Sequence, residues 1–296
     1  MTDAITTPLL ATGKQVLACL DASAYTESVA RHAAWAAHRL DAPLEFLHVL
    51  DRHAEKAGVL DASGSLDIDQ QAKLLDALAA LDESQARLAQ EKARLLLQRA
   101  KTVASDSHGV AAETRLRHGG LVDTLTGLEP GVRLFVLGKR GEHADFARGH
   151  LGSQLERAVR AVHRPLLVAS RAFSDVRRVL VAFDGSATTR KGVEMVAASP
   201  LFQGLDIRVL LVGDDTAAHQ DALRWALDTL ARADHAAEGT LRPGTPDEEI
   251  ARAVDAGGVD LLVMGAYGHS RIRQLIVGST TTTVLRTCRI PVLLLR

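Results

Sequence analysis

Short runs of apolar residues alternate along the chain with longer amphipathic segments that are rich in alanine. Strands that are apolar on both faces are typical of a sheet covered by helices on both sides. Strand and helix in alternation predict a parallel sheet wound with right-handed crossovers. The pattern therefore predicts α/β domains with doubly wound, open parallel sheets of about five strands each. The apolar runs are residues 15–20, 43–50, 132–138, 165–170, 178–183, 206–212, 259–265 and 291–295.

The same pattern occurs twice in the chain. Residues 15–50 align without a gap with residues 178–213, so that Asp21 matches Asp184 and Val49 matches Val212. A repeat of this length indicates two copies of one domain. We predict a first domain over residues 1–172 and a second over residues 173–296.

The first copy carries an insertion at about residues 51–88. After Lys73 it is rich in Ala, Leu, Gln, Glu, Lys and Arg, which favour helix. We interpret it as a long helix that packs on its own sheet, and the alternative is an arm that contacts a partner subunit. Five leucines fall near one helical face, with Gln85 and Lys92 between them: Leu74, Leu78, Leu81, Leu88 and Leu95.

The last strand of each copy is short and apolar, as in PVLLL at residues 291–295. Apolar strand edges rarely stay exposed. We therefore predict self-association through these final strands, either between the two copies or between two chains.

The composition narrows the functional classes. Of the 296 residues, 35 are Lys or Arg and 36 are Asp or Glu, so no overall field attracts nucleic acid or an anionic membrane. The N-terminus has no leader-like pattern and no apolar stretch reaches the length of a membrane span, which predicts a cytoplasmic protein. Cys19 and Cys288 lie in apolar runs, which is typical of core residues and not of a disulfide framework.

Three glycines follow the apolar run that ends the fourth strand of the second copy. In open parallel sheets, ligands bind beyond the carboxyl ends of the strands. Gly265 and Gly268 let a ligand approach the main chain, and Gly278 precedes a helix whose first amides have no intrahelical partner and favour an anion. Glycines also serve loops without a ligand, but here the spacing recurs at the matched place in the other copy.

Hydroxyl groups follow these glycines at the start of the predicted helix. Ser279 is the predicted N-cap, and Thr280 and Thr281 place hydroxyls beside the same amides. Arg271 and Arg273 lie in the intervening loop, where guanidinium groups would screen phosphate charge. The sequence therefore predicts a phosphate-binding loop.

Gly265, Gly268, Gly278 and Ser279 match the G-x2-G-x9-G-(S/T) pattern of nucleotide-binding universal stress proteins, and the chain resembles that family in its tandem, two-domain form. The resemblance implies five-stranded parallel sheets of order 3-2-1-4-5, as in adenine nucleotide alpha hydrolase-like folds. It implies binding of ATP, with Mg²⁺ as a companion ion, and ADP or AMP stay open as alternatives.

The resemblance also assigns roles to residues of the second copy. Asp184 would contact ribose or adenine, and Val212 would present its main chain to the adenine edge. Met264 and Gly265 would lie along the sugar and base. Phosphates and ribose would be held by Gly268, Gly278, Ser279, Thr280 and Thr281.

The first copy departs from the pattern. Ten residues separate its second and third glycines, and Gln154 and Leu155 replace the threonines. Glu142 and Asp145 would repel a phosphate, and Lys139, Arg140 and Arg148 would offset them. We therefore predict the second copy as the better site. The counterparts in the first copy are Asp21, Val49, Gly138, Gly141, Gly152 and Ser153.

The sequence favours a binding protein over an enzyme. It contains no GxxxxGK(S/T), HExxH, GxSxG or SGGxDS motif, and no residue stands out as a base that would orient water. The leading hypothesis is a stress-response regulator that uses ATP occupancy to change its conformation or its partners. Two alternatives stay open: an interaction protein without nucleotide, and a weak ATPase.

Overall fold

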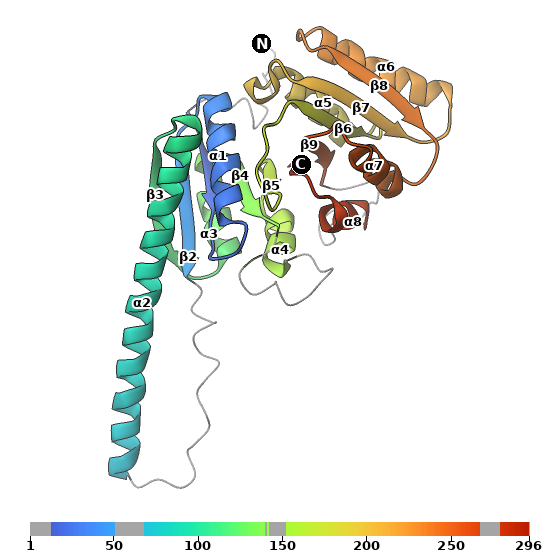
Figure 1. Cartoon of the computed structure of the whole chain (residues 1–296). Coiled ribbons are helices and arrows are strands. Elements are labelled where there is room, and N and C mark those ends of the chain that lie inside the picture. Colours follow the sequence, from blue (N-terminus) through green and yellow to red (C-terminus); the bar gives the residue numbers. More distant parts are fainter. Residues whose placement is uncertain (1–12, 51–67, 140, 142–151, 267–278, 296) are drawn as a thin grey trace, which may run out of the picture.

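One ten-stranded sheet runs through the computed structural model, which describes residues 13–50, 68–139, 141, 152–266 and 279–295 (Figure 1). The strand order is β3-β2-β1-β4-β5-β10-β9-β6-β7-β8, so each copy has the predicted order 3-2-1-4-5. The predicted fold class is confirmed, and the two five-stranded units are joined edge to edge. The strands are β1 Gln15–Cys19, β2 Leu44–Leu50, β3 Ala112–His118, β4 Val132–Gly138, β5 Leu166–Ala169, β6 Arg178–Phe183, β7 Asp206–Val212, β8 Ala237–Arg242, β9 Leu261–Gly265 and β10 Val292–Leu295.

Helices cover both faces of this sheet, as the continuous apolar strands predict. One apolar cluster joins α1, α2, α5 and α6 to one face, and a second joins α3, α4, α7 and α8 to the other. Within the described residues, no helix is both long enough and apolar enough to span a membrane. The helices are α1 Thr26–Leu40, α2 Ile68–His108, α3 Leu121–Leu128, α4 Ser153–Ala161, α5 Ala187–Ala198, α6 Ala217–Ala231, α7 Pro246–Asp255 and α8 Ser279–Thr287, with 3-10 turns η2 Glu129–Gly131 and η3 Pro200–Phe202.

The two copies meet where β5 pairs antiparallel with β10. Leu293 lies opposite Leu167, and both side chains are buried. The final strands thus pair between the copies of one chain. Because each copy is parallel within itself, the carboxyl ends of its strands point the opposite way from those of the other copy at this junction.

Side chains of the first copy also reach main-chain oxygens of the second. Arg39 of α1 donates from Nε to the carbonyl of Leu201 at 2.7 Å and also contacts the carbonyl of Gln203. Lys139, which follows β4, donates to the carbonyl of Cys288 just after α8. Its ammonium therefore interacts with the second copy, and the expectation that it also offsets charge in the loop of the first copy stays a prediction.

A buried histidine lies beneath the segment that joins the copies. His32 of α1 is 0% exposed, and the ring of Phe173 approaches it edge-on with centroids 4.9 Å apart. Its Nδ1–H donates to the carbonyl of Ser28 at 2.7 Å, whereas Nε2 has no partner among the described residues. Burial therefore lowers the pKa of His32 to about 4, because a second ring proton would have no acceptor.

The insertion forms the N-terminal part of α2, which projects away from the sheet (Figure 1). Only the C-terminal part of the helix packs on the first copy, through Ala93, Leu97, Ala100 and Ala104. The interpretation of a long helix that packs on its own sheet is therefore confirmed for the C-terminal part of α2, and it is wrong for the projecting part with its exposed leucines. We call its exposed members the leucine stripe: Leu74, Leu81, Leu88 and Leu95, which are 40%, 53%, 56% and 63% exposed.

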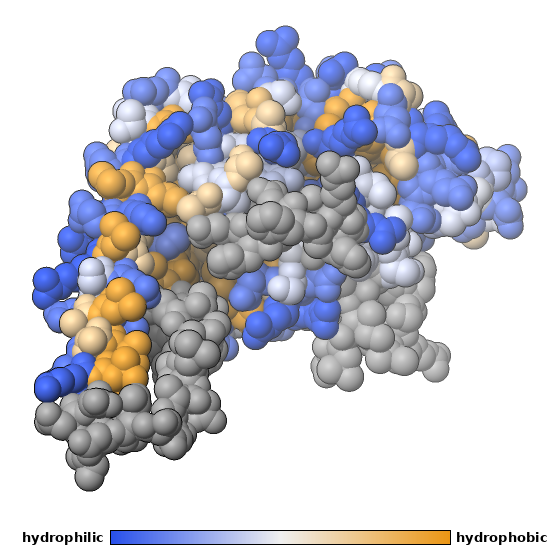
Figure 2. Space-filling model, turned by 60° about the horizontal axis from the view of Figure 1, so that its bottom comes forward, coloured by the Kyte–Doolittle hydropathy of each residue, from blue (hydrophilic) through white to orange (hydrophobic). Residues whose placement is uncertain are grey.

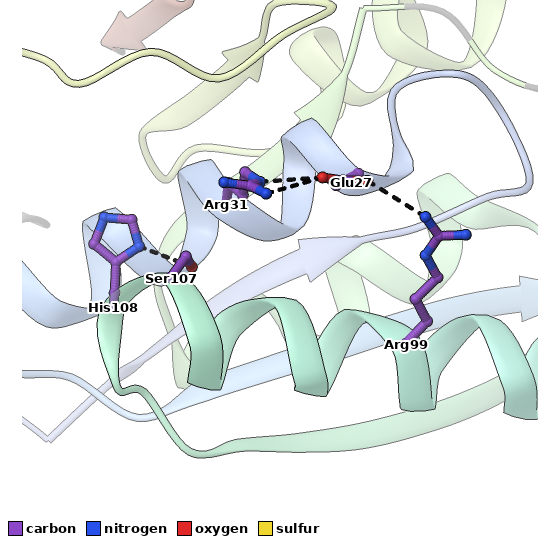
Figure 3. Close-up of polar contacts among 5 residues, drawn as sticks. All are labelled: Glu27, Arg31, Arg99, Ser107 and His108. Atoms are coloured by element: carbon purple, nitrogen blue, oxygen red, sulfur yellow. Dashed lines mark hydrogen bonds and ion pairs between the residues drawn. The ribbon is translucent and has the colours of Figure 1, made fainter.

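An ion-pair cluster holds the packed part of α2 against α1 (Figure 3). Glu27 of α1 accepts from Arg31 on its own helix at 3.0 Å and from Arg99 of α2 at 3.4 Å. These groups are exposed, so each pair contributes little to stability.

Candidate functional site

Two candidate sites lie at the carboxyl ends of strands. The site of the second copy is bordered by the ends of β6, β7 and β9 and by the start of α8, and that of the first copy by the ends of β1, β2 and β4 and the start of α4. The central strand of each copy therefore ends between its two neighbours, where a sheet of this order changes winding direction.

An aspartate follows the central strand in both copies and closes the same turn. Oδ1 of Asp184 accepts from the amide of Ser186 at 2.9 Å and from Oγ1 of Thr189 at 2.6 Å. Oδ1 of Asp21 accepts from the amide of Ser23 at 3.1 Å. Such turns hold a carboxylate in a fixed place. The structure therefore presents each aspartate beside the first turn of the helix that follows it.

Thr281 joins the start of α8 to the end of β9. Its side chain is 2% exposed, and Oγ1 donates to the carbonyls of Gly265 at 3.4 Å and of Ala266 at 3.2 Å. This hydroxyl is occupied within the protein, so its role is to position the helix. Thr280 is partly buried and Ser279 is exposed.

The start of α8 borders residues outside the described part of the chain. The helix is described from Ser279 onward, so the expectation that Ser279 is its N-cap stays a prediction. In the first copy, Gly152 caps α4 and no side chain caps its amides. A glycine cap leaves the first-turn amides without a side-chain acceptor, which is the condition under which an anion binds there.

His219 lies near the end of β7, beside the candidate site. This residue was not among those predicted from the sequence. Val212 is partly buried, and Gly213 follows it. A Cβ on Gly213 would lie 2.7 Å from Cε1 of His219, so a larger residue there would make this ring turn away. The ring is fixed by an Nδ1–H bond to the carbonyl of Asp214 at 2.7 Å. Gly213, a glycine directly after a strand, was the feature of the sequence that could have pointed to a neighbouring side chain here.

A cation also lies at this end of the sheet in the second copy. Arg190 of α5 donates from Nε to the carbonyl of Gly185 at 3.1 Å, and its guanidinium lies 4.5 Å from the ring centroid of Trp225. Trp225 in turn stacks on Phe183, the last residue of β6. The guanidinium is therefore held by an aromatic face next to the Asp184 turn.

In the first copy the structure brings Gly141 close to Asp21 and Gly138, the last residue of β4, close to the start of α1. A Cβ on Gly141 would lie 3.1 Å from Oδ2 of Asp21, and one on Gly138 would lie 3.0 Å from Cβ of Tyr25. Val49, near the end of β2, is partly buried, and Ser153 begins α4. These glycines therefore let main chain and helix α1 approach closely.

Replacing Gly138 by Ala should lower the free energy of unfolding by about 1–3 kcal/mol, because the new methyl overpacks against Tyr25 and Val29 of α1. Gly127→Ala is the matched control, because its Cβ would meet nothing within 4 Å and alanine favours helix. Urea unfolding followed by circular dichroism measures both. Equal stability of the two variants would contradict the close approach at Gly138.

Several predicted residues lie outside the described part of the chain, and their placement stays a prediction. They are Gly268, Gly278, Arg271 and Arg273 of the second copy, and Arg140, Glu142, Asp145 and Arg148 of the first.

Comparison with known proteins identifies the family. The model of the universal stress protein family matches residues 13–170 and again residues 175–296. The chain belongs to the universal stress protein family. Its membership confirms the resemblance that the glycine spacing suggests, and both copies are universal stress protein domains.

Relatives of this universal stress protein match it over nearly its whole length. The universal stress protein Slr1230 of Synechocystis sp. is 37% identical over 286 residues, which cover 96% of this chain and 100% of Slr1230. The crystal structure of a universal stress protein from Archaeoglobus fulgidus covers 97% of this chain and 99% of its own, with a TM-score of 0.66 and 19% identity. This second likeness shows that the tandem fold is shared.

Proposed function

We propose that this universal stress protein binds ATP, or a related adenine nucleotide, at the strand ends of its second copy and acts as a nucleotide-dependent regulator in the cytoplasm. The observation that carries the proposal is the bond from Thr281 to the carbonyls at the end of β9. This bond holds the start of α8 beside the strand end, and the first amides of a helix, which have no intrahelical partner, attract an anion.

The surrounding groups support a nucleotide with a polar sugar and a flat base. Asp184 lies after the central strand, where its carboxylate would accept from hydroxyl groups of a ribose. The partly buried end of β7 offers main chain to a base edge, and His219 and Trp225 are aromatic groups at the same side of the sheet. Mg²⁺ would enter with the phosphates, because its sites in nucleotide-binding proteins use phosphate oxygens and few side chains.

The second copy suits an anion better than the first. Its helix begins Ser-Thr-Thr, whereas α4 begins Ser-Gln-Leu and has Glu156 in its first turn. The ammonium of Lys139 donates a hydrogen bond to the carbonyl of Cys288 in the second copy. We therefore expect the tighter nucleotide site at α8.

The test is to denature the purified full-length protein and to identify any released small molecule by mass spectrometry, with its stoichiometry per chain. Protein stripped of ligand is then heated with ATP and Mg²⁺. We expect an adenine nucleotide in the released fraction and a raised melting temperature, since a ligand that binds only the folded state stabilises it. No released nucleotide together with an unchanged melting temperature would overturn the proposal and favour a nucleotide-free interaction protein.

Slow hydrolysis is measured in the same preparations. Phosphate release that keeps a constant specific activity through purification, and that is lost when Ser279 is replaced, would assign a weak ATPase to this site. Release that falls away on purification would assign the activity to a contaminant.

A further inference from the structure

The leucine stripe on the projecting part of α2 repeats every seven residues. Leu74, Leu81, Leu88 and Leu95 span three heptads, or about 32 Å of helix. Leucines at this interval keep to one side of a helix that winds around another helix. A full coiled-coil seam has a second apolar position in each heptad, and here that position holds Leu78 and then the polar residues Gln85 and Lys92. The spacing therefore points to pairing with a helix.

Within the described residues the stripe stays exposed. Its leucines are 40–63% exposed, and Leu88 and Leu95 also line open hollows beside the first copy, next to the face of α2 that packs on that copy. The same apolar face is seen along the projecting part of the helix in Figure 2. Contiguous exposed apolar surface of this kind marks an interaction site.

The charges of α2 are divided along its length. Between Lys73 and Glu83, three acidic residues stand against one lysine, whereas between Ser84 and Lys101 basic residues predominate. Two such helices attract each other when they run antiparallel, because the acidic part of each lies on the basic part of the other. The acidic residues are Asp76, Asp82 and Glu83, and the basic residues that would lie opposite this part are Arg87, Lys92 and Arg94, with Glu91 among them. Within one chain Arg87 also pairs with Glu83, and Arg99 is bound to Glu27 of α1.

The sheet itself offers a poorer surface for joining two chains. Its short apolar strands β5 and β10 already pair with each other. The outer strands β3 and β8 carry charged residues such as Arg115 and Glu238, which discourage edge-to-edge pairing. The self-complementary helix is therefore the better candidate.

We propose that α2 pairs antiparallel with α2 of a second copy of this chain. A two-fold axis between Ser84 and Gln85 would set Leu81 against Leu88 of the partner subunit, and Leu74 against Leu95 of the partner subunit. The same register brings Asp82 close to Arg87 of the partner subunit. One surface patch then serves both chains, as a two-fold interface requires.

Sedimentation velocity of the full-length protein over a range of concentrations tests the pairing. The wild type should be a dimer, and Leu81→Gln/Leu88→Gln should raise the dimer dissociation constant at least a hundredfold. Glutamine favours helix, so α2 should keep its helical signal in circular dichroism. Leu75→Gln is the matched control, because Leu75 is 66% exposed but lies about 100° around the helix from Leu74.

Cysteine crosslinking tests the direction of pairing. Ser84→Cys lies beside the two-fold axis and should form a disulfide-linked dimer. Ala77→Cys occupies the same side of the helix, but the two copies of this residue would lie about 22 Å apart and should not crosslink. The native Cys19 and Cys288 give little background, because burial raises the pKa of both thiols.

The possible results distinguish between the molecules or segments that could cover the leucine stripe. A wild-type monomer at all concentrations would overturn the proposal and would favour residues 51–67 or another protein as the cover. A dimer that survives Leu81→Gln/Leu88→Gln would overturn it as well. Crosslinking of both cysteine variants would replace the antiparallel arrangement by a parallel one.

Discussion

Replacing Ser279 by Asp should weaken ATP binding at least a hundredfold without unfolding the protein. The new carboxylate would stand at the first turn of α8, where the proposed phosphates bind. Two unit charges of like sign at 4 Å repel by about 4 kcal/mol near a protein surface, and several phosphate charges share the site. A negative group at a helix N-terminus is itself favourable, so the melting temperature of the free protein should stay level or rise slightly.

Ser153→Asp is the matched control, because Ser153 begins the corresponding helix α4 of the first copy. Equilibrium dialysis with labelled ATP measures both variants and the wild type. The second-copy site predicts a large loss for Ser279→Asp and near-normal binding for Ser153→Asp. The reverse result would move the nucleotide to the first copy, and unchanged binding in both variants would refute the helix-start sites.

The protein should lose about 3 kcal/mol of stability as the pH falls from 6.5 to 4 because of His32 alone. The pKa of His32 is about 4 in the folded protein and about 6.5 in an unfolded chain, so in this window the unfolded state binds a proton that the folded state does not. The contribution of neutral His32 to the free energy of unfolding is therefore present above about pH 6.5, and it decreases as the pH is lowered toward 4. His108 acts in the same direction, because burial also lowers its pKa.

His32→Leu tests this contribution, because leucine has a similar volume and no titrating group. Its baseline stability should drop through loss of the bond to the Ser28 carbonyl, so the readout is the change between pH 7 and pH 4.5. Urea unfolding at both pH values should show a smaller loss in His32→Leu than in the wild type. Equal losses would mean that His32 does not titrate as its burial requires.

Most of the fold could be predicted from the sequence, because strands that are buried on both faces occur as continuous runs of apolar residues. Each continuous apolar run, such as the one that ends at Val212, is a strand of the sheet, and the gapless repeat predicts the second copy from the first. The strand pairing at Leu293 follows the same physical logic, because an apolar edge needs a partner.

The leucine-rich helix could not be placed from its pattern. Periodicity shows that leucines share a face, but it does not show which of two faces meets the sheet. Ala93, Leu97, Ala100 and Ala104 form the face of α2 that packs on the first copy, and the leucine stripe lies outside it. A hydropathy pattern does not separate these two faces, because both contain leucine.

The position of the candidate site stays a prediction, and the sequence did not indicate the contacts that its hydroxyls and cations make. Thr281 has the same chemistry as Thr280, but only one of the two is buried against the carbonyls after β9. Lys139 lies in the expected loop, but its long side chain reaches Cys288 of the other copy. Such roles depend on contacts between segments far apart in the chain.

Isothermal titration calorimetry of the full-length protein with ATP and Mg²⁺ tests the central claim most directly. The account predicts a saturable heat of binding at the second copy that disappears in Ser279→Asp and persists in Ser153→Asp. A ligand-free wild-type protein that gives no heat of binding at any ATP concentration would contradict it.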